Sequence, residues 1–323
     1  MQKLAKALFL FLIIACGSDT GSKIISSSGV IDPNTGNGGN DGNGGDDSIP
    51  DLVVELISSY NDDTASFSTV FGNYTRSFIV HTPPNYDSNN GPIPLLFVLH
   101  GYTGQAPGIR NYSGFDSIAD EENFIVVYVQ GVADQITNNT GWNAGVGTFT
   151  NVDDVGLFSA LIKYFKGNYN IADSKIFSTG MSMGGFMSYR LACELEEINS
   201  IGSVTGSMAA YYNCVPPNQK SIIHFHGTAD TVVPYNGNSW SINVENVHSL
   251  WANHNECQNN SEVTIPDFNG DGVVSTQLTS YDCNGNREVI LYTMENEGHT
   301  WFKKEWGHDV DTSRLIWEFF KDK

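Results

Sequence analysis

Apolar residues fall into short continuous runs along the chain, separated by segments in which they recur with helical spacing. Continuous runs of about five apolar residues are typical of strands that are buried on both faces of a sheet. Five strands of this kind are predicted, at residues 95–99, 124–128, 175–179, 221–225 and 288–292, and the last of them is expected to be the final strand of the chain.

Two segments between and after these strands have the spacing of helices. Residues 154–165 place apolar side chains on one face, and residues 312–320 do the same at the end of the chain. Asp153 or Asp154 is expected to cap the first of these helices. Alternating strands and helices predict an α/β fold, with a mostly parallel sheet covered by helices on both faces. Active sites in such folds lie at the carboxyl ends of the strands.

The first fifteen residues have the layout of a signal peptide. Lys3 and Lys6 precede an apolar run at residues 8–15, which is too short to span a bilayer. The small residue Ala15 precedes Cys16, as in a bacterial lipobox, in which the cysteine becomes the lipidated first residue. We therefore expect a secreted protein that is lipid-anchored to the bacterial outer membrane or cell surface. An ordinary signal peptide with an incidental cysteine is the alternative.

A polar linker and one folded domain are predicted after the signal peptide. Residues 16–50 are rich in Gly, Asn, Asp and Ser, and the stretch 37–47 has almost no apolar content. Such a segment cannot bury enough surface to offset its ordering entropy, so it predicts a flexible tether. Residues 51–323 suit a single α/β domain, because no second linker interrupts them. No later segment is apolar enough to span a membrane.

The formal net charge of the chain is −20, and the linker carries part of it. Acidity on this scale keeps an exported protein soluble and repels polyanions. The sequence has no basic stripe, which argues against nucleic acid as a partner. It is compatible with a neutral ester or a neutral polysaccharide as substrate, and with membrane contact only through the N-terminal lipid.

Four cysteines remain besides Cys16, and export places them where disulfides persist. Four cysteines allow three pairings, and spacing alone does not choose among them. We expect Cys257 to pair with Cys283 and, on weaker grounds, Cys193 to pair with Cys214. The sequence has no Cys-x-x-Cys motif, so a cysteine-bound metal cluster is not expected.

One segment matches the start of a calcium-binding EF-hand loop. Residues 267–272 have its spacing, but the twelfth position is Leu278, where a bidentate Glu is required. We therefore expect a polar turn that leads into a strand at residues 273–278. The sequence implies no metal and no organic cofactor.

The strongest candidate for chemistry is Ser182, in the G-M-S-M-G motif at residues 180–184. The pattern is common by chance, but here a predicted strand precedes it and an apolar segment follows it. A strand-to-helix turn this sharp requires small neighbours, which Gly180, Gly184 and Gly185 supply. The Ser182 hydroxyl would then project above the sheet as a nucleophile.

A serine nucleophile needs a base, and the base needs an orienting acid. In folds with this nucleophile turn, the acid and then the histidine follow the serine along the chain. Asp230 follows the fourth predicted strand as the candidate acid, and His299 follows the last one as the candidate base. His308 is the rival base, although Asp309 and Asp311 suggest a helix start there. Other histidines are expected to be packing or surface residues, or to lie where this order does not fit: His81, His224, His226, His248 and His254.

The oxyanion of a tetrahedral intermediate needs hydrogen-bond donors aimed at it. One is expected to be the backbone amide of Met183, the residue after the nucleophile. The second is placed on the amide of Tyr102, with Gly101 as the alternative, because the loop 100–104 begins where a strand ends. Removing one such donor typically costs about 3 kcal/mol of transition-state stabilisation.

Two tryptophans are predicted to contact the substrate. Trp142 lies in a loop that is expected at the rim of the site, and a role as a buried anchor of that loop is equally open. Trp301 follows the candidate base by two positions.

Together these segments resemble the secreted α/β-hydrolase esterases known as polyhydroxybutyrate depolymerases and the feruloyl esterases of carbohydrate esterase family one. The resemblance covers nearly the whole predicted domain, at residues 76–84, 95–104, 152–170, 177–193, 224–235 and 289–301. It implies that Ser182, Asp230 and His299 form a catalytic triad. Two departures lie close to the expected pocket: Met183 stands where many relatives have Asn, and residues 302–304 (Phe-Lys-Lys) stand where relatives commonly have Pro-Gly.

The sequence therefore predicts a serine ester hydrolase that works by two-step acyl transfer to water. His299 would take the proton of Ser182, the hydroxyl would attack an ester carbonyl, and water would then release the acid. The expected substrates are feruloyl or acetyl esters on plant polysaccharide, or short polyhydroxyalkanoate esters. An acyltransferase on the same fold and a non-catalytic, surface-anchored glycan-binding lipoprotein are the alternatives.

Overall fold

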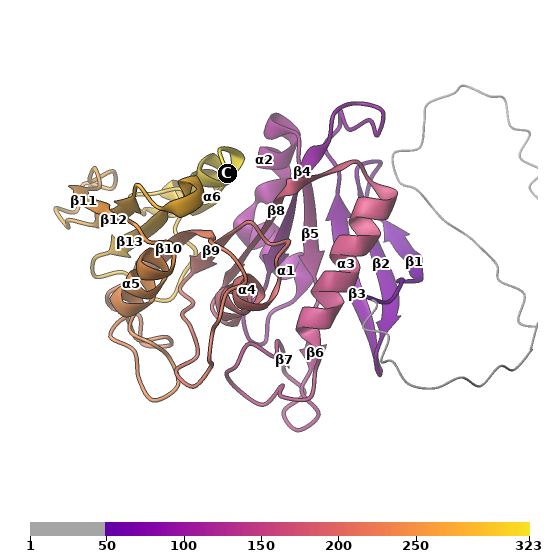
Figure 1. Cartoon of the computed structure of the whole chain (residues 1–323), viewed down its shortest axis with the longest axis horizontal. Coiled ribbons are helices and arrows are strands. Elements are labelled where there is room, and N and C mark those ends of the chain that lie inside the picture. Colours follow the sequence, from indigo (N-terminus) through magenta and orange to yellow (C-terminus); the bar gives the residue numbers. More distant parts are fainter. Residues whose placement is uncertain (1–48) are drawn as a thin grey trace, which may run out of the picture.

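The structure, a computed structural model, describes residues 49–323; the predicted signal peptide, Cys16 and nearly all of the predicted linker lie outside these residues. Within the described part, eleven strands form one sheet in the order β1-β2-β3-β5-β4-β8-β9-β10-β13-β12-β11 (Figure 1). The strands are β1 (Val54–Ser59), β2 (Thr64–Phe71), β3 (Tyr74–His81), β4 (Ile93–Leu99), β5 (Ile125–Val129), β8 (Ile171–Met181), β9 (Ser200–Val204), β10 (Ser221–Gly227), β11 (Asn259–Thr264), β12 (Thr276–Tyr281) and β13 (Val289–Met294). A separate two-stranded sheet consists of β6 (Val132–Ala133) and β7 (Thr140–Gly141).

The centre of the sheet is parallel, and both of its edges are antiparallel. β5, β4, β8, β9, β10 and β13 run in the same direction. The β1–β3 segment pairs antiparallel on one side, and the β11–β12 hairpin does so on the other. The predicted mostly parallel sheet is thus confirmed. Its topology brings the carboxyl ends of β4, β8, β10 and β13 to the same edge, where active sites of such sheets form.

Helices cover both faces of the sheet, as predicted. One face packs against α3 (Asp154–Asn168), α4 (Met183–Glu194) and α5 (Val244–His254), and the other against α1 (Ala106–Ser113), α2 (Phe115–Glu122) and α6 (Thr312–Lys321) (Figure 1). Short 3₁₀ helices lie at Asn284–Asn286 and Lys304–Trp306. The side chain of Asp153 caps α3 by accepting a hydrogen bond from the Gly156 amide, so of the two predicted cap residues Asp153 has that role.

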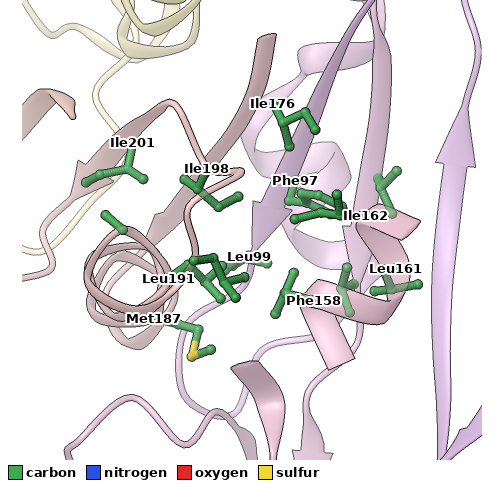
Figure 2. Packing of buried hydrophobic residues seen from close by; sticks show 14 of the residues in the cluster. Phe97, Leu99, Phe158, Leu161, Ile162, Ile176, Met187, Leu191, Ile198 and Ile201 are labelled. Carbon is green, nitrogen blue, oxygen red and sulfur yellow. The ribbon is translucent and has the colours of Figure 1, made fainter. Parts of the chain in front are cut away.

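Alternate residues of β4 contribute to two hydrophobic cores. Leu95, Phe97 and Leu99 belong to the core under α3 and α4, whereas Leu96 and Val98 belong to the core under α1, α2 and α6. All five side chains are fully buried. Figure 2 shows the first of these cores, where side chains of α3 and α4 close over the central strands. Burying an aliphatic or aromatic side chain of this size contributes about 1.5–3 kcal/mol, so this continuous apolar run is what fixes the centre of the sheet.

The five predicted strands and both predicted helices are present, with ends that differ by a few residues. The predicted strand at 273–278 begins later, at Thr276, because the Val273 amide donates to Asp271 Oδ1 and prolongs the turn. β9 was not predicted, because its small and polar residues do not form an apolar run although they are buried. The strands β1, β2, β3 and β11 were not predicted either, because none of them has an apolar run longer than three residues.

Two disulfides form as expected. Cys193 on α4 is bonded to Cys214, with 5.3 Å between their Cα atoms. Cys257 and Cys283 are bonded across the base of the β11–β12 hairpin, with Cα atoms 3.8 Å apart. Disulfides persist in oxidising compartments. No helix within residues 49–323 combines the length and apolar character that a membrane span requires.

Candidate active site

Ser182 lies at the sharp turn between β8 and α4. Its backbone has φ 55° and ψ −122°, a conformation that non-glycine residues rarely adopt. The Ser182 amide donates to the carbonyl of Val204 at 2.8 Å, which ties the turn to the neighbouring strand β9. Strained residues of this kind persist only where their surroundings hold them, and they gather at functional sites. The turn lifts Ser182 above the carboxyl end of the sheet, as the motif predicted.

The glycines around Ser182 leave no space for side chains. A Cβ atom at Gly180 would lie 2.8 Å from the Leu99 carbonyl oxygen, and one at Gly184 would lie 2.3 Å from the same oxygen. A Cβ at Gly185 would lie 2.5 Å from the Ser203 hydroxyl oxygen. The expected need for small residues at these three positions is therefore confirmed, and its cause is the close approach of β4 and β9 to the turn.

Asp230 and His299 come from the loops that follow β10 and β13, and they meet side chain to side chain. His299 Nδ1 lies 2.7 Å from Asp230 Oδ2. A carboxylate only accepts hydrogen bonds, so Nδ1 carries a proton, and Nε2 of the neutral ring is left as an acceptor. The other carboxylate oxygen, Oδ1, accepts the amides of Val232 and Val233 at 2.8 and 2.9 Å.

The carboxyl group of Asp230 is held in its ionised form although it is buried. Burial alone would raise its pKa, but hydrogen bonds from His226, His299 and the Val233 amide outweigh burial and hold the pKa of Asp230 well below its usual range. A permanently ionised carboxylate behind an imidazole can orient the ring and stabilise it when it becomes charged.

A cavity of about 330 Å³ brings Ser182 and His299 together at the carboxyl ends of the strands. Its other walls come from the loop after β4 and from α1, and they include Gly101, Tyr102 and Tyr112. The rival base, His308, instead places Nδ1 2.7 Å from a carboxylate oxygen of Glu297. Of the two candidates, His299 is thus the one that pairs with Asp230 and faces the cavity of Ser182.

The loop at residues 100–104 packs directly against the candidate nucleophile. A Cβ atom at Gly101 would lie 3.1 Å from the Ser182 Cβ. The buried His100 ring accepts the Gly131 amide at Nε2, at 2.9 Å, so its proton is on Nδ1, which donates to the Gly101 carbonyl at 2.7 Å. Burial lowers the pKa of His100 to about 4, which keeps the ring neutral at pH 7.

A peptide group fixed at its carbonyl oxygen is also fixed at its N–H. The Gly101 carbonyl accepts from His100 and from the Gly104 amide, the latter at 2.9 Å. Because carbonyl and N–H of a trans peptide point in opposite directions, the Tyr102 amide points away from the His100 ring. His100 therefore sets the direction of the amide that the sequence named as an oxyanion donor.

The two predicted substrate-binding tryptophans are both fully buried, and this part of the prediction is wrong. Trp142 donates its indole N–H to the His100 carbonyl at 2.8 Å, and Trp301 donates its own to the Ser313 hydroxyl at 2.9 Å. Each side chain anchors a loop from inside, so neither is exposed to a substrate. The aromatic residues that line the cavity are Tyr102 and Tyr112. Neither tyrosine ring was predicted to line the cavity, because the motif points only to the amide of Tyr102 and Tyr112 belongs to no motif.

A buried ion pair lies behind the loop at residues 100–104 and supports it through Trp142. Arg76 Nη2 lies 2.8 Å from Asp154 Oδ1, and both side chains are nearly inaccessible. The other oxygen of Asp154 accepts the Asn143 amide at 2.7 Å, which holds the residue next to Trp142. The Arg76 guanidinium lies 6.0 Å from the centroid of the Trp142 ring. Arg76 and Asp154 therefore fix Trp142, whose indole in turn donates to the carbonyl of His100, the first residue of this loop.

Acidic residues of the EF-hand-like segment are occupied by the backbone. The Asp267 carboxylate accepts the amides of Gly270, Asp271 and Gly272, and Asp309 accepts the Phe268 amide. Within residues 49–323, no group of three or more His, Cys, Asp or Glu side chains is arranged to hold a metal ion. The segment forms a polar turn between β11 and β12.

Comparison with known proteins identifies relatives of this chain. Residues 68–288 match the model of the family described as "Putative esterase". The chain is 31% identical over 226 residues to "Probable feruloyl esterase C" of Aspergillus flavus, which covers 69% of this chain and 76% of that protein. It is 26% identical over 263 residues to feruloyl esterase D of Neurospora crassa, with 76% and 81% covered. An acetyl xylan esterase structure from Aspergillus awamori matches with a TM-score of 0.54 at 14% identity, over 84% of this chain and 100% of that one.

Proposed function

Because the chain belongs to this esterase family and is a carboxylic ester hydrolase with the α/β-hydrolase fold, we propose that it cleaves feruloyl or acetyl esters of plant polysaccharide. The relatives bear out the predicted resemblance to feruloyl esterases of carbohydrate esterase family one. They give no specific support to the polyhydroxybutyrate depolymerase type. A hydroxyalkanoate ester is therefore kept as a comparison substrate in the experiment below.

One observation carries the catalytic part of the proposal. His299 bonds to Asp230 at 2.7 Å and shares the cavity of about 330 Å³ with Ser182. This placement supports Ser182 as nucleophile, His299 as general base and acid, and Asp230 as the group that orients the base. Along the chain, Ser182 follows β8, Asp230 follows β10 and His299 follows β13, which is the order that a nucleophile turn of this kind requires.

The proposed reaction has two steps. His299 Nε2 takes the proton from Ser182 Oγ as that oxygen attacks the ester carbonyl, and the resulting imidazolium is stabilised by the ionised Asp230. Collapse of the tetrahedral intermediate breaks the bond to the alcohol oxygen, which receives the proton from His299. Water then repeats the attack on the acyl-enzyme, with His299 again as the base, and releases the acid and the free serine.

Two backbone amides are proposed to hold the oxyanion. Met183 begins α4, and the first amides of a helix have no carbonyl partner within the helix. The Tyr102 amide is directed by the hydrogen bond from His100 to the Gly101 carbonyl. Donors held in place before the reaction need no reorganisation when negative charge develops on the carbonyl oxygen, which is why such sites stabilise the transition state.

Ferulate is named first because the relatives with the highest identity reported above are feruloyl esterases. Two tyrosines line the cavity, and aromatic rings pack well against a planar aromatic acid or against a sugar ring. Tyr112 is held in place by its hydroxyl group, which lies 3.0 Å from Thr300 Oγ1, next to the proposed base.

Export and lipid anchoring belong to the same proposal. Two disulfides within the folded part support an oxidising, extracellular environment. We propose that residues 1–15 are a signal peptide, that Cys16 carries the lipid and that residues 16–50 tether the enzyme domain, residues 51–323, to the surface.

A hydrolysis panel tests the proposal. Purified protein is given methyl ferulate, acetylated xylan, p-nitrophenyl acetate and a hydroxybutyrate oligomer, and the released acids are quantified. We expect turnover of methyl ferulate or acetylated xylan, and faster turnover of these than of the oligomer. Cleavage of the oligomer alone would overturn the proposed substrate class.

Both alternative functions have distinct outcomes in the same panel. Transfer of the acyl group to an added sugar or lipid alcohol, in preference to water, would identify an acyltransferase. Binding of xylan without release of any acid from the four esters would identify a glycan-binding protein. Neither alternative is favoured by the esterase relatives.

A further inference from the structure

A chain of buried polar side chains leads from α4 to the carboxylate of Asp230. Tyr189 Oη lies 2.9 Å from His224 Nδ1, and His224 Nε2 lies 3.1 Å from His226 Nδ1. His226 Nε2 lies 2.8 Å from the Val233 carbonyl oxygen and 3.4 Å from Asp230 Oδ2. Each of these side chains is at most a few per cent exposed. The mechanism proposed above uses neither His224 nor His226.

The direction of the hydrogen bonds in this chain follows from its last acceptor. A carbonyl oxygen only accepts, so His226 carries a proton on Nε2. If the ring is neutral, its Nδ1 then accepts from His224 Nε2, and His224 Nδ1 accepts from the Tyr189 hydroxyl. Burial lowers the pKa of His224 far below its usual value and raises that of Tyr189, which is consistent with a chain of neutral groups. Every donor therefore points toward Asp230.

His226 thus contacts both parts of the loop that presents the acid. Its Nε2 donates to the Val233 carbonyl and lies within 3.4 Å of Asp230 Oδ2. The same carboxylate oxygen accepts the hydrogen bond from His299 Nδ1. The amides of Val232 and Val233 hold the other oxygen of Asp230. Rotation of the carboxylate about its bond to Cβ would break contacts on both oxygens. The geometry fixes Asp230 at the angle at which it meets His299.

We propose that His226 is a positioning residue of the acid–base pair: it orients Asp230 and, by sharing Oδ2, weakens the hold of that oxygen on the His299 proton. This inference rests on the proposed roles of Asp230 and His299. It predicts that loss of the His226 donor lowers kcat and also raises the pH at which His299 loses its proton, because a carboxylate with fewer donors attracts that proton more strongly.

Other titratable groups around His226 must be considered in such a pH measurement. His224 is its partner on β10, and the ring of Tyr235 lies with its centroid 6.0 Å from that of His226. Burial raises the pKa of Tyr235 to about 12, so Tyr235 keeps its proton throughout the acid limb. Tyr235 in turn donates to a carboxylate oxygen of Glu245 at 3.4 Å, and Glu297, two residues before His299, is paired with His308.

The chain offers a matched control in His248. This histidine of α5 is also buried, its pKa is lowered by burial, and its Nε2 lies 3.2 Å from a strand carbonyl, that of Val289. It bonds to β13 rather than to the acid loop. Loss of its ring therefore has the general cost of changing a buried histidine without changing the donor to Asp230.

The experiment compares His226→Leu, His226→Gln, His226→Asn and His248→Leu in the full chain, with p-nitrophenyl acetate as substrate. We expect His226→Leu to lower kcat by about tenfold to a hundredfold, as misalignment of catalytic groups does, with little change in KM. The acid limb of the kcat/KM profile should shift to higher pH. His226→Gln, whose amide reaches the position of Nε2, should restore most of the rate and the pH profile.

Two further variants separate positioning from folding. His226→Asn keeps a buried amide but is one methylene shorter than Gln, so it should behave like His226→Leu even if His226→Leu fails to fold. His248→Leu should lower stability and leave the pH profile unchanged. The proposal is overturned if folded His226→Leu or His226→Asn keeps the wild-type kcat and acid limb, or if His248→Leu shifts the acid limb equally. Failure of the proposed catalytic roles would be distinguishable, because the wild-type protein itself would then release no acid from p-nitrophenyl acetate.

Discussion

Two groups of loops meet at Ser182, and they are built in different ways. On the side proposed to hold the oxyanion, called the oxyanion side below, residues 100–104 present backbone amides, and the direction of the Tyr102 amide is set by the buried His100. On the side proposed to transfer protons, called the acid–base side, Asp230 and His299 present side chains, and the His299 ring remains 17% exposed. Both sides rest on a buried histidine, His100 on one and His226 on the other.

The difference follows from what each side has to do. A backbone donor for an oxyanion has to stay in one position throughout the reaction, so a rigid buried scaffold suits it. A general base has to gain and lose a proton and to face the substrate, so it needs access to the cavity. Rigid support on the oxyanion side comes from the Arg76–Asp154 pair and from Trp142, all of which are buried.

The largest effect is expected from breaking the ion pair behind the loop at residues 100–104. Asp154→Ala leaves the buried Arg76 charge without its partner and removes the acceptor of the Asn143 amide. Loss of one member of a buried pair typically costs about 3–5 kcal/mol. Chemical denaturation of wild type and variant measures this loss. The exposed pair of Glu121 and Arg314 is the control, because Glu121→Ala should change the free energy of unfolding by less than about 1 kcal/mol.

A cost of Asp154→Ala as small as that of Glu121→Ala would contradict the rigid support assigned to the oxyanion side. In that case Trp142 and His100 would have to be held by the apolar packing around them alone.

A smaller effect is expected from His100, and it concerns the rate rather than the fold. His100→Leu removes the donor to the Gly101 carbonyl, so the Tyr102 amide is no longer held in one direction. We expect kcat to fall by about tenfold to a hundredfold, less than for complete removal of an oxyanion donor. The acid limb of the pH profile should stay in place, in contrast to the His226 variants. His100→Asn, whose shorter side chain places its amide near the position of Nδ1 and can donate to the Gly101 carbonyl, is the control.

Wild-type kcat in folded His100→Leu would show that the amide direction is set without the ring. A shift of the acid limb in this variant would show that the two sides of the site are not separate.

The smallest effect concerns stability at acidic pH. The pKa of His100 is about 4 in the folded chain against a usual 6.5, because burial disfavours the charged ring. The unfolded chain binds this proton first, so the contribution of His100 is complete above pH 6.5 and is lost as the pH falls toward 4. One proton changes the free energy of unfolding by about 1.4 kcal/mol per pH unit. Between about pH 6 and pH 4, the free energy of unfolding should therefore fall less steeply with decreasing pH in His100→Gln than in the wild type.

Other groups do not obscure this comparison. The pKa of Asp230 is depressed, so its contribution is lost only below the usual carboxyl range, under about pH 4. His224 and His248 also have lowered pKa values, and they add the same slope to wild type and variant. Equal slopes in the two proteins would contradict the neutral, buried His100.

More of the acid–base side than of the oxyanion side could be predicted from the sequence. Side-chain chemistry could be predicted, because Ser182, Asp230 and His299 each follow an apolar strand in a fixed order. The proposed oxyanion donors could be predicted only from their position beside the nucleophile turn and after a strand, because a backbone amide is common to nearly all residue types and leaves no mark in the sequence. The direction of the Tyr102 amide depends on His100 and Gly131, which are 31 positions apart and come together only in the fold.

Burial was the main source of error at the site. Trp142 and Trp301 lie near the catalytic residues in sequence, but whether an indole faces a substrate or the interior depends on the neighbouring loops. His226 does not fit the order of serine, acid and base along the chain, so it is not predicted as the base. This order gives no information about a histidine that supports the acid instead.

The fold shows the same limit. Central strands such as β4 have continuous apolar runs because both faces are buried. β9 is equally buried, but three of its five residues are Ser or Gly, and its neighbours lie close: a Cβ at Gly202 would lie 2.8 Å from the Thr179 hydroxyl of β8. The pattern of large apolar residues therefore does not reveal it.

The central claim is that Ser182 is the nucleophile of an ester hydrolase, activated through His299 and Asp230. Labelling with a fluorophosphonate probe, followed by mass spectrometry of the peptides, tests it most directly. We expect one labelled peptide, the one that contains Ser182. Labelling and p-nitrophenyl acetate hydrolysis should both be lost in Ser182→Ala, fall by about 10⁴-fold or more in His299→Ala, and remain in Ser249→Ala, which removes an exposed hydroxyl of α5. A label on another residue, or hydrolysis retained in Ser182→Ala, would contradict the account.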